Sequence, residues 1–234
     1  MTATDPSASA WTRNFYPRLG DGVAFDRVVF FCDAVFAIAL TLAAVEIGIP
    51  EVDAQDAASI PAMWEAIQDK VPGVVGFLVA FGVVAFYWRA NHRFTMTLRG
   101  MDRAYVMAVI LYLGLISLLP LPAAMLGEYA GNPLAVTIFA LYASAASGME
   151  VVLFLVADRR GLFVAPLSAA FRRQQVLGSL SPLAVFLTSI PLAFVNPVLA
   201  MGWWLVGSVG AGFLLSRLAP AQSPPDVVET SEAS

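Results

Sequence analysis

The residue of this sequence with the clearest potential for chemistry is an aspartate inside a long apolar run. Asp33 lies in the stretch 27–47, which is otherwise almost entirely apolar and is long enough to cross a bilayer. Other apolar runs contain, or end in, Arg89, His92 and Glu150. Hydrocarbon tolerates such groups only where they face protein or water, so each one marks a contact between helices or a path for ions or protons.

Around the axis of the first helix, Asp33 lies on a different face from four other residues. Four side chains share one stripe if each residue turns the helix by about 100°: Ile38, Thr41, Leu42 and Val45. Asp33 falls about 140° away from Ile38, on the back of the helix. We therefore expect Asp33 to point toward neighbouring helices and away from the stripe.

The composition is that of an integral membrane protein. Of the 234 residues, 59% are hydrophobic and only 13% are charged, against roughly 25% charged residues in a soluble domain. Six apolar segments can span a bilayer, at about 25–48, 72–94, 104–124, 134–157, 176–195 and 197–216. We predict an all-α integral membrane protein with a polar arm at 1–24, a single six-helix transmembrane domain at 25–217 and a disordered tail at 218–234.

The basic residues predict the orientation of these helices, because cytoplasmic loops hold an excess of Lys and Arg. With six spans, ten arginines fall on one side: Arg13, Arg18, Arg93, Arg99, Arg103, Arg159, Arg160, Arg172, Arg173 and Arg217. The opposite loops are acidic or neutral apart from Lys70. No cleavable signal pattern precedes the first apolar run. We therefore expect both termini to be cytosolic.

This topology predicts a polar layer near the cytosolic face. Asp33, Arg89, His92 and Glu150 would all lie within about 15 Å of the inner ends of their helices. Because ionisable groups at this depth tend to pair, we expect Asp33 to bond with Arg89 or His92. The layer can serve as a structural connection between helices, or as a proton relay or gate.

Small residues spaced four apart predict close helix contacts in two segments. They are Ala140, Ser144 and Gly148 in the fourth segment and Gly207 and Ala211 in the sixth.

Two motifs resemble a known family. Arg27, Phe31, Cys32 and Asp33, followed by Ala-Val-Phe-Ala-Ile-Ala-Leu-Thr-Leu, resemble the Arg-x-x-x-Phe-Ser-Asp signature of the transmembrane protein 175 family of potassium channels. At the end of the second segment, Trp88, Arg89, Asn91 and His92 belong to a run similar to the family's Trp-x-x-His/Asn-His-Arg segment. With the run Leu118-Leu119-Pro120-Leu121-Pro122, the resemblance covers about residues 25–130.

The resemblance implies a channel without the usual carbonyl filter, in which four six-helix subunits form a homotetramer around their first helices. It assigns the narrowest ring to Ile38 and further pore-lining layers to Thr41, Leu42 and Val45. Such a channel would select potassium, leak other monovalent cations, reside in the plasma membrane and use no cofactor. Its partners would be potassium ions, the lipid bilayer and further copies of the chain.

Three residues near these motifs leave alternatives open. Cys32 replaces the motif serine, and since a thiol is a weaker hydrogen-bond partner, the polar network is expected to be looser. Glu46, about two turns beyond Ile38, can concentrate cations at the outer mouth or simply be solvated. His92 can be a hydrogen-bonded structural residue, a pH sensor or a metal ligand.

Other function classes have less support. A proton-coupled secondary transporter could use Asp33 and Glu150 as carriers, but the sequence has no evident internal repeats or paired broken helices. An enzyme is not expected, because the His-Glu-x-x-His and Gly-x-Ser-x-Gly patterns are absent. The single cysteine excludes an intramolecular disulfide. The net charge of −4 argues against nucleic acid as a partner.

Overall fold

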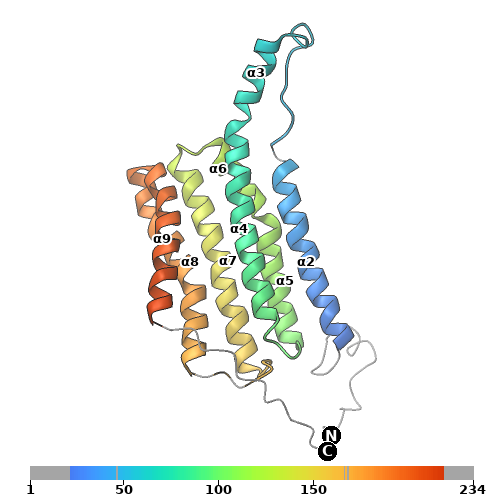
Figure 1. Ribbon diagram of the computed structural model, residues 1–234, viewed down its shortest axis with the longest axis vertical. Coiled ribbons are helices and arrows are strands. Elements are labelled where there is room, and N and C mark those ends of the chain that lie inside the picture. The colour runs from blue at the N-terminus through green and yellow to red at the C-terminus, as the bar shows by residue number, and fades with distance from the viewer. Residues whose placement is uncertain (1–21, 46, 166, 168, 219–234) are drawn as a thin grey trace, which may run out of the picture.

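The computed structural model describes residues 22–45, 47–165, 167 and 169–218. In chain order its helices are α2 (Gly22–Val45), α3 (Ile60–Asp69), α4 (Val71–Thr95), α5 (Arg103–Leu118), α6 (Pro120–Glu128), α7 (Pro133–Arg159), α8 (Ala169–Val195) and α9 (Pro197–Leu218). The long helices run side by side as a bundle (Figure 1). The arm predicted at 1–24 and the tail predicted at 218–234 lie almost entirely outside the described residues.

Six stretches of the described chain are long and apolar enough to cross a membrane. They are Phe25–Val45, Ile60–Thr95, Arg103–Glu128, Pro133–Arg159, Arg172–Val195 and Pro197–Leu214. Each covers most or all of one predicted segment. The prediction of an all-α chain with six possible spans is therefore confirmed.

The second span begins with a helix, α3, that was not predicted from the sequence. α3 extends beyond the end of the bundle and leads directly into α4 (Figure 1). Ser59 caps α3, because its Oγ accepts a hydrogen bond from the Ala62 amide at 3.4 Å, and Pro61 stands in the first turn. The segment predicted at 72–94 corresponds to α4 alone.

The third span is broken near its end. α5 stops at Leu118, and α6 begins at Pro120. Proline lacks a backbone N–H, and its ring clashes with the carbonyl four residues earlier, so a straight helix does not continue through it. The single segment predicted at 104–124 thus consists of two helices.

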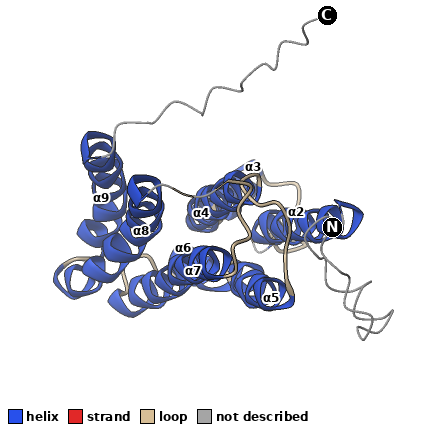
Figure 2. Cartoon of the chain, turned by 90° about the horizontal axis from the view of Figure 1, so that it is seen from below, coloured by secondary structure: helices blue, strands red, loops and turns tan. Residues whose placement is uncertain are grey.

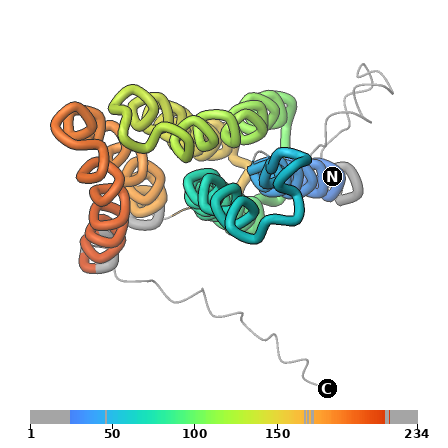
Figure 3. Tube along the Cα trace, turned by 90° about the horizontal axis from the view of Figure 1, so that it is seen from above, coloured from blue at the N-terminus to red at the C-terminus, as the bar shows by residue number. Residues whose placement is uncertain are grey.

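The arrangement of the bundle leaves α2 at its edge. α2 packs against α4 and α5, while α9 packs mainly against α8. Figures 2 and 3 show α2 and α9 at opposite sides of the bundle. The largest fully buried side chains include Tyr87, Tyr105, Tyr112, Phe36 and Phe139. Phe36 is the largest side chain that α2 contributes to this core, and its ring centroid lies 6.0 Å from that of Tyr112.

Two helix crossings depend on glycine. A Cβ at Gly76 of α4 would lie 2.7 Å from the Cα of Gly127 on α6, which no side chain tolerates without a shift of the backbone. A Cβ at Gly207 would lie 3.0 Å from Cγ2 of Val185 on α8. The predicted close contact is therefore confirmed at Gly207, but not at Gly148, where a Cβ would meet nothing within 4 Å. The closest crossing, at Gly76, was not anticipated.

The loops after α4 and α7 pair with each other at one end of the bundle. The amide of Arg99 donates to the carbonyl of Leu162 at 2.9 Å, and the amide of Val164 donates to the carbonyl of Thr97 at 3.0 Å. Gly161 ends α7 with φ at +62°, a conformation that favours glycine. Its carbonyl accepts a hydrogen bond from the Arg99 guanidinium at 2.9 Å.

The same end holds two ion pairs. Nε of Arg160 lies 3.5 Å from the Asp102 carboxylate, and Nη2 of Arg172 lies 3.0 Å from the Asp158 carboxylate. Arginines that are distant in sequence are thus brought to the same end of the molecule.

Candidate functional site

One face of α2 is buried in the subunit and the opposite face is not. Four side chains of α2 point into the bundle and are at most 4% exposed: Cys32, Phe36, Ala39 and Ala43. By contrast, Ile38 is 56% exposed, Leu42 43% and Val45 72%. Because the two sets alternate with the period of a helix, α2 leaves a continuous stripe uncovered by its own subunit.

The uncovered stripe is apolar except for one hydroxyl and an arginine at one end. It continues from Ile38 through the exposed Phe31 and Ala34 to the exposed Arg27. Thr41 is also exposed, and its hydroxyl lies 2.9 Å from the carbonyl of Ile38 and 3.1 Å from that of Ala37. The proton of this hydroxyl is therefore directed at the helix backbone, and its oxygen remains available to accept. Glu46 lies outside the described residues.

Asp33 lies on the side of α2 that faces α4, as the angular reading predicted, but its partner was predicted wrongly. The indole Nε1 of Trp88 donates to Oδ1 of Asp33 at 2.9 Å. His92, one turn further along α4, stacks on Trp88 with the ring centroids 5.4 Å apart. Neither Arg89 nor His92 has a described bond to Asp33.

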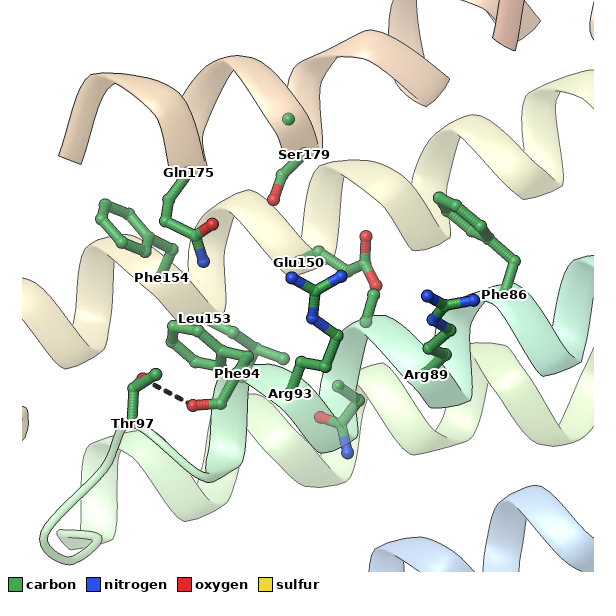
Figure 4. Close-up of a pocket in the computed structure, with 13 residues that line it drawn as sticks. Phe86, Arg89, Arg93, Phe94, Thr97, Glu150, Leu153, Phe154, Gln175 and Ser179 are labelled. Carbon is green, nitrogen blue, oxygen red and sulfur yellow. Dashed lines mark hydrogen bonds between the residues drawn. The ribbon is translucent and has the colours of Figure 1, made fainter. Parts of the chain in front are cut away.

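The reason is the rotation of α4. Trp88 and His92 are four residues apart and share the face toward α2, whereas Arg89 and Arg93 share a face turned by about 100°. This second face looks toward α7 and α8, where Arg89 and Arg93 line a cavity together with Glu150 (Figure 4). The single polar layer was therefore predicted wrongly. Asp33 and His92 lie on the side of α4 that faces α2, and Arg89 and Glu150 line the cavity on another side.

Two tyrosines form a polar connection inside the bundle that the sequence reading missed. The hydroxyl of Tyr112 donates to Oε1 of Glu150 at 3.1 Å. The Tyr87 hydroxyl lies 2.7 Å from the carbonyl of Ala143 and 2.8 Å from Oγ of Ser147. Most buried tyrosine hydroxyls are hydrogen-bonded, so Tyr87 and Tyr112 in apolar segments were a signal that a neighbouring helix offers acceptors.

The cavity between α4, α7 and α8 measures about 550 Å³. Its polar and charged lining residues are Arg89, Asn91, Arg93, Thr97, Glu150, Gln175 and Ser179. Its apolar wall is formed mainly by Phe86, Phe94, Leu153 and Phe154. Asn91 is thus a buried wall residue, and no hydrogen bond to Asp33 is described for it. Among the described residues, no group of three His, Cys, Asp or Glu side chains could hold a metal ion.

The α2 stripe can act on ions only as part of an assembly, since one helix cannot enclose a pore. If several copies meet along it, Ile38, Leu42 and Val45 would form apolar rings that exclude strongly hydrated ions. Thr41 would then supply hydroxyl oxygens between these rings.

Comparison with known proteins identifies relatives of this chain. A family profile described as "Endosomal/lysosomal potassium channel TMEM175" matches residues 27–120, which include most of α2 and all of α3, α4 and α5. A curated potassium channel of Streptomyces collinus is 30% identical over 184 residues, which are 75% of this chain and 85% of that protein. A curated potassium channel of Chamaesiphon minutus is 29% identical over 130 residues, 54% of this chain and 61% of that protein.

Solved structures share the fold. A crystal structure described as a lysosomal potassium-selective channel TMEM175 homolog from Chamaesiphon minutus superposes with a TM-score of 0.65, covering 82% of this chain and 98% of that chain at 23% identity. A variant of the potassium channel MtTMEM175 in complex with a nanobody fusion superposes with a TM-score of 0.54, covering 82% and 89% at 17% identity. The extent and identity of the Streptomyces collinus match decide the assignment: this chain belongs to the TMEM175 family of potassium channels.

Proposed function

We propose that this chain forms a potassium channel in which α2 from each of four subunits lines the pore. The observation that carries the proposal is the uncovered stripe of α2, on which Ile38, Leu42 and Val45 are 56%, 43% and 72% exposed. The opposite side of the same helix is fully packed by α4 and α5. Family membership supports potassium as the permeating ion.

The pore chemistry follows from the side chains on the stripe. Rings of Ile38, Leu42 and Val45 would form a hydrophobic constriction that opposes fully hydrated ions and can gate by dewetting. Potassium sheds water more easily than sodium, so an apolar ring favours potassium without backbone carbonyl ligands. Because no ligand cage enforces ion size, we expect selectivity to be modest and other monovalent cations to leak through.

The predicted orientation is supported by where the arginines gather. The loops after α4 and α7 contact each other, and they carry Arg99, Arg160 and their neighbours at one end of the bundle. Under the positive-inside rule this end faces the cytosol. We therefore propose a plasma-membrane channel with both termini cytosolic.

The alternative of a proton-coupled transporter gains no support from the arrangement of its two carboxylates. Asp33 accepts a hydrogen bond from Trp88, between α2 and α4. Glu150 accepts one from Tyr112, between α7 and α5. The two acids have different partners on different sides of α4 and do not form one relay.

The test is potassium flux into liposomes that contain the purified channel, with the reversal potential measured under a sodium–potassium gradient. In Ile38→Asn, a polar ring should wet the constriction, raise the potassium current severalfold and shift the reversal potential toward that of a nonselective pore.

The matched control is Ile110→Asn, the same chemical change at a side chain of α5 that is 48% exposed. This variant should conduct like the parent. If a folded Ile38→Asn channel has the same current and selectivity as the parent, Ile38 and the α2 stripe do not line the pore.

A further inference from the structure

Two arginines line the cavity between α4, α7 and α8 without a described ion pair. Arg99, Arg160 and Arg172 are held by a carbonyl or a carboxylate. Among the described residues, no carboxylate oxygen lies within 4.0 Å of the guanidinium of Arg89 or Arg93. Arg89 and Arg93 nevertheless stand one turn apart and point into the same space (Figure 4).

The depth of this pair matches the headgroup region of a bilayer. Arg89 and Arg93 precede the last residue of α4, Thr95, by six and two positions, which places them about 9 Å and 3 Å from the helix end. The polar region of each leaflet is roughly 5–7 Å thick. With the end of α4 at the outer edge of this region, Arg93 lies within it and Arg89 just below it, and a long arginine side chain bridges the remaining distance to a lipid phosphate.

The charges and shapes in the cavity suit a phosphodiester. Two arginines outnumber Glu150, the one acidic residue of the lining, so the lining is net positive, and a phosphodiester carries one negative charge. Guanidiniums bind phosphate oxygens in pairs of parallel hydrogen bonds. Oε1 of Glu150 is already engaged by the Tyr112 hydroxyl. Gln175 and Ser179 on α8 present further polar groups from the opposite wall.

The apolar half of the lining distinguishes a lipid from a free anion. Phe86, Leu153 and Phe154 form a wall that a hydrated inorganic ion would leave without contacts, whereas the glycerol and first acyl carbons of a lipid would cover it. At about 550 Å³ the cavity also has the size of a small-molecule site, about 300–1,000 Å³. We propose that this cavity binds the phosphate headgroup of an anionic phospholipid, with Arg89 and Arg93 as its phosphate ligands.

The experiment is native mass spectrometry of the full chain, purified in detergent and exposed to phosphatidylglycerol, phosphatidylcholine or inorganic phosphate, with thermal unfolding measured under the same conditions. Phosphatidylglycerol should remain bound and raise the unfolding temperature more than the other two ligands. In R89Q/R93Q its retention should fall by at least about tenfold, because two charge-assisted contacts are lost.

The matched control is R159Q/R173Q, which removes the same charge from two exposed arginines of α7 and α8 that do not line the cavity. It should retain phosphatidylglycerol like the parent. R89K/R93K keeps the charge but cannot form the two parallel hydrogen bonds of a guanidinium, so it should retain an intermediate amount of phosphatidylglycerol. This variant preserves the test if R89Q/R93Q does not fold.

Three outcomes would overturn the proposal. In the first, the parent and both cavity variants retain phosphatidylglycerol equally. In the second, R159Q/R173Q loses as much phosphatidylglycerol as R89Q/R93Q. In the third, inorganic phosphate raises the unfolding temperature as much as phosphatidylglycerol does. Because the readout is lipid binding, it is independent of whether α2 lines a potassium pore.

Discussion

At the scale of single residues, the bond between Trp88 and Asp33 connects the motif of α2 to α4. The acceptor is a half-buried carboxylate and the donor is the indole Nε1, 2.9 Å away. Trp88→Phe keeps an aromatic side chain but removes the indole N–H, so Asp33 is left without this partner. We expect the free energy of unfolding to fall by about 1 kcal/mol, measured by thermal unfolding in detergent.

Trp64→Phe is the control for this change. Trp64 lies on α3, is 60% exposed and has no described hydrogen bond, so its replacement should leave stability unchanged. A Trp88→Phe protein as stable as the parent would mean that the bond contributes nothing. Altered ion selectivity at unchanged stability would contradict the placement of Asp33 away from the pore.

The sequence was sufficient to predict the side of α2 on which Asp33 lies, but not its partner. The side follows from counting residues along one helix. The partner depends on how α4 is rotated, and Trp88, Arg89 and His92 all lie at a suitable depth. Packing of the whole bundle fixes that rotation, and it places Arg89 in the cavity that Glu150 also lines (Figure 4).

At the scale of helices, the contact between Gly76 and Gly127 holds α4 against α6. In Gly76→Ala the new Cβ would lie 2.7 Å from the Gly127 Cα, so one helix must move. We expect the unfolding temperature to drop by several degrees, because backbone cannot yield as a flexible side chain does.

Gly82→Ala on the same helix is the matched control. A Cβ there meets nothing within 4 Å, and alanine is the better helix former by about 1 kcal/mol. Gly82→Ala should therefore unfold at the same temperature as the parent or higher. If both variants behave alike, the crossing at Gly76 does not limit stability.

The lengths and apolar character of the spans could be predicted from the sequence, because a bilayer sets both. The break before α6 and the start of α3 were not predicted, although Pro120 and the capping residue Ser59 mark them in the sequence. The glycine crossing could not be predicted, because Gly76 and Gly127 are 51 positions apart (127 − 76). Nothing local distinguishes them from Gly114 or Gly148, which have open space around them.

At the scale of the whole molecule, the proposed tetramer makes a prediction about which surfaces meet. In a Cys32→Ser background, which removes the single cysteine, Leu42→Cys should form disulfide-linked dimers in membranes under mild oxidation. Residues around a narrow pore come within the roughly 7 Å between Cα atoms that a disulfide spans. The measurement is electrophoresis without reducing agent.

Val206→Cys is the control, since Val206 is also exposed, at 67%, but belongs to α9, which lies on the opposite side of the bundle from α2. It should remain monomeric on the gel. Cross-linking at position 206 without cross-linking at position 42 would place α9, and not α2, at the centre of the assembly.

The uncovered stripe of α2 has a consequence for how such a channel is made. Ile38, Leu42 and Val45 are side chains that lipid tails solvate well, and the Thr41 hydroxyl is already directed at carbonyls of its own helix. Between Ile38 and Val45, a newly inserted subunit can therefore face lipid alone without exposing an unsatisfied polar group. A pore lined by charges or carbonyls would need its partners at once, whereas here insertion can precede oligomerisation, and subunits can meet by diffusion in the membrane.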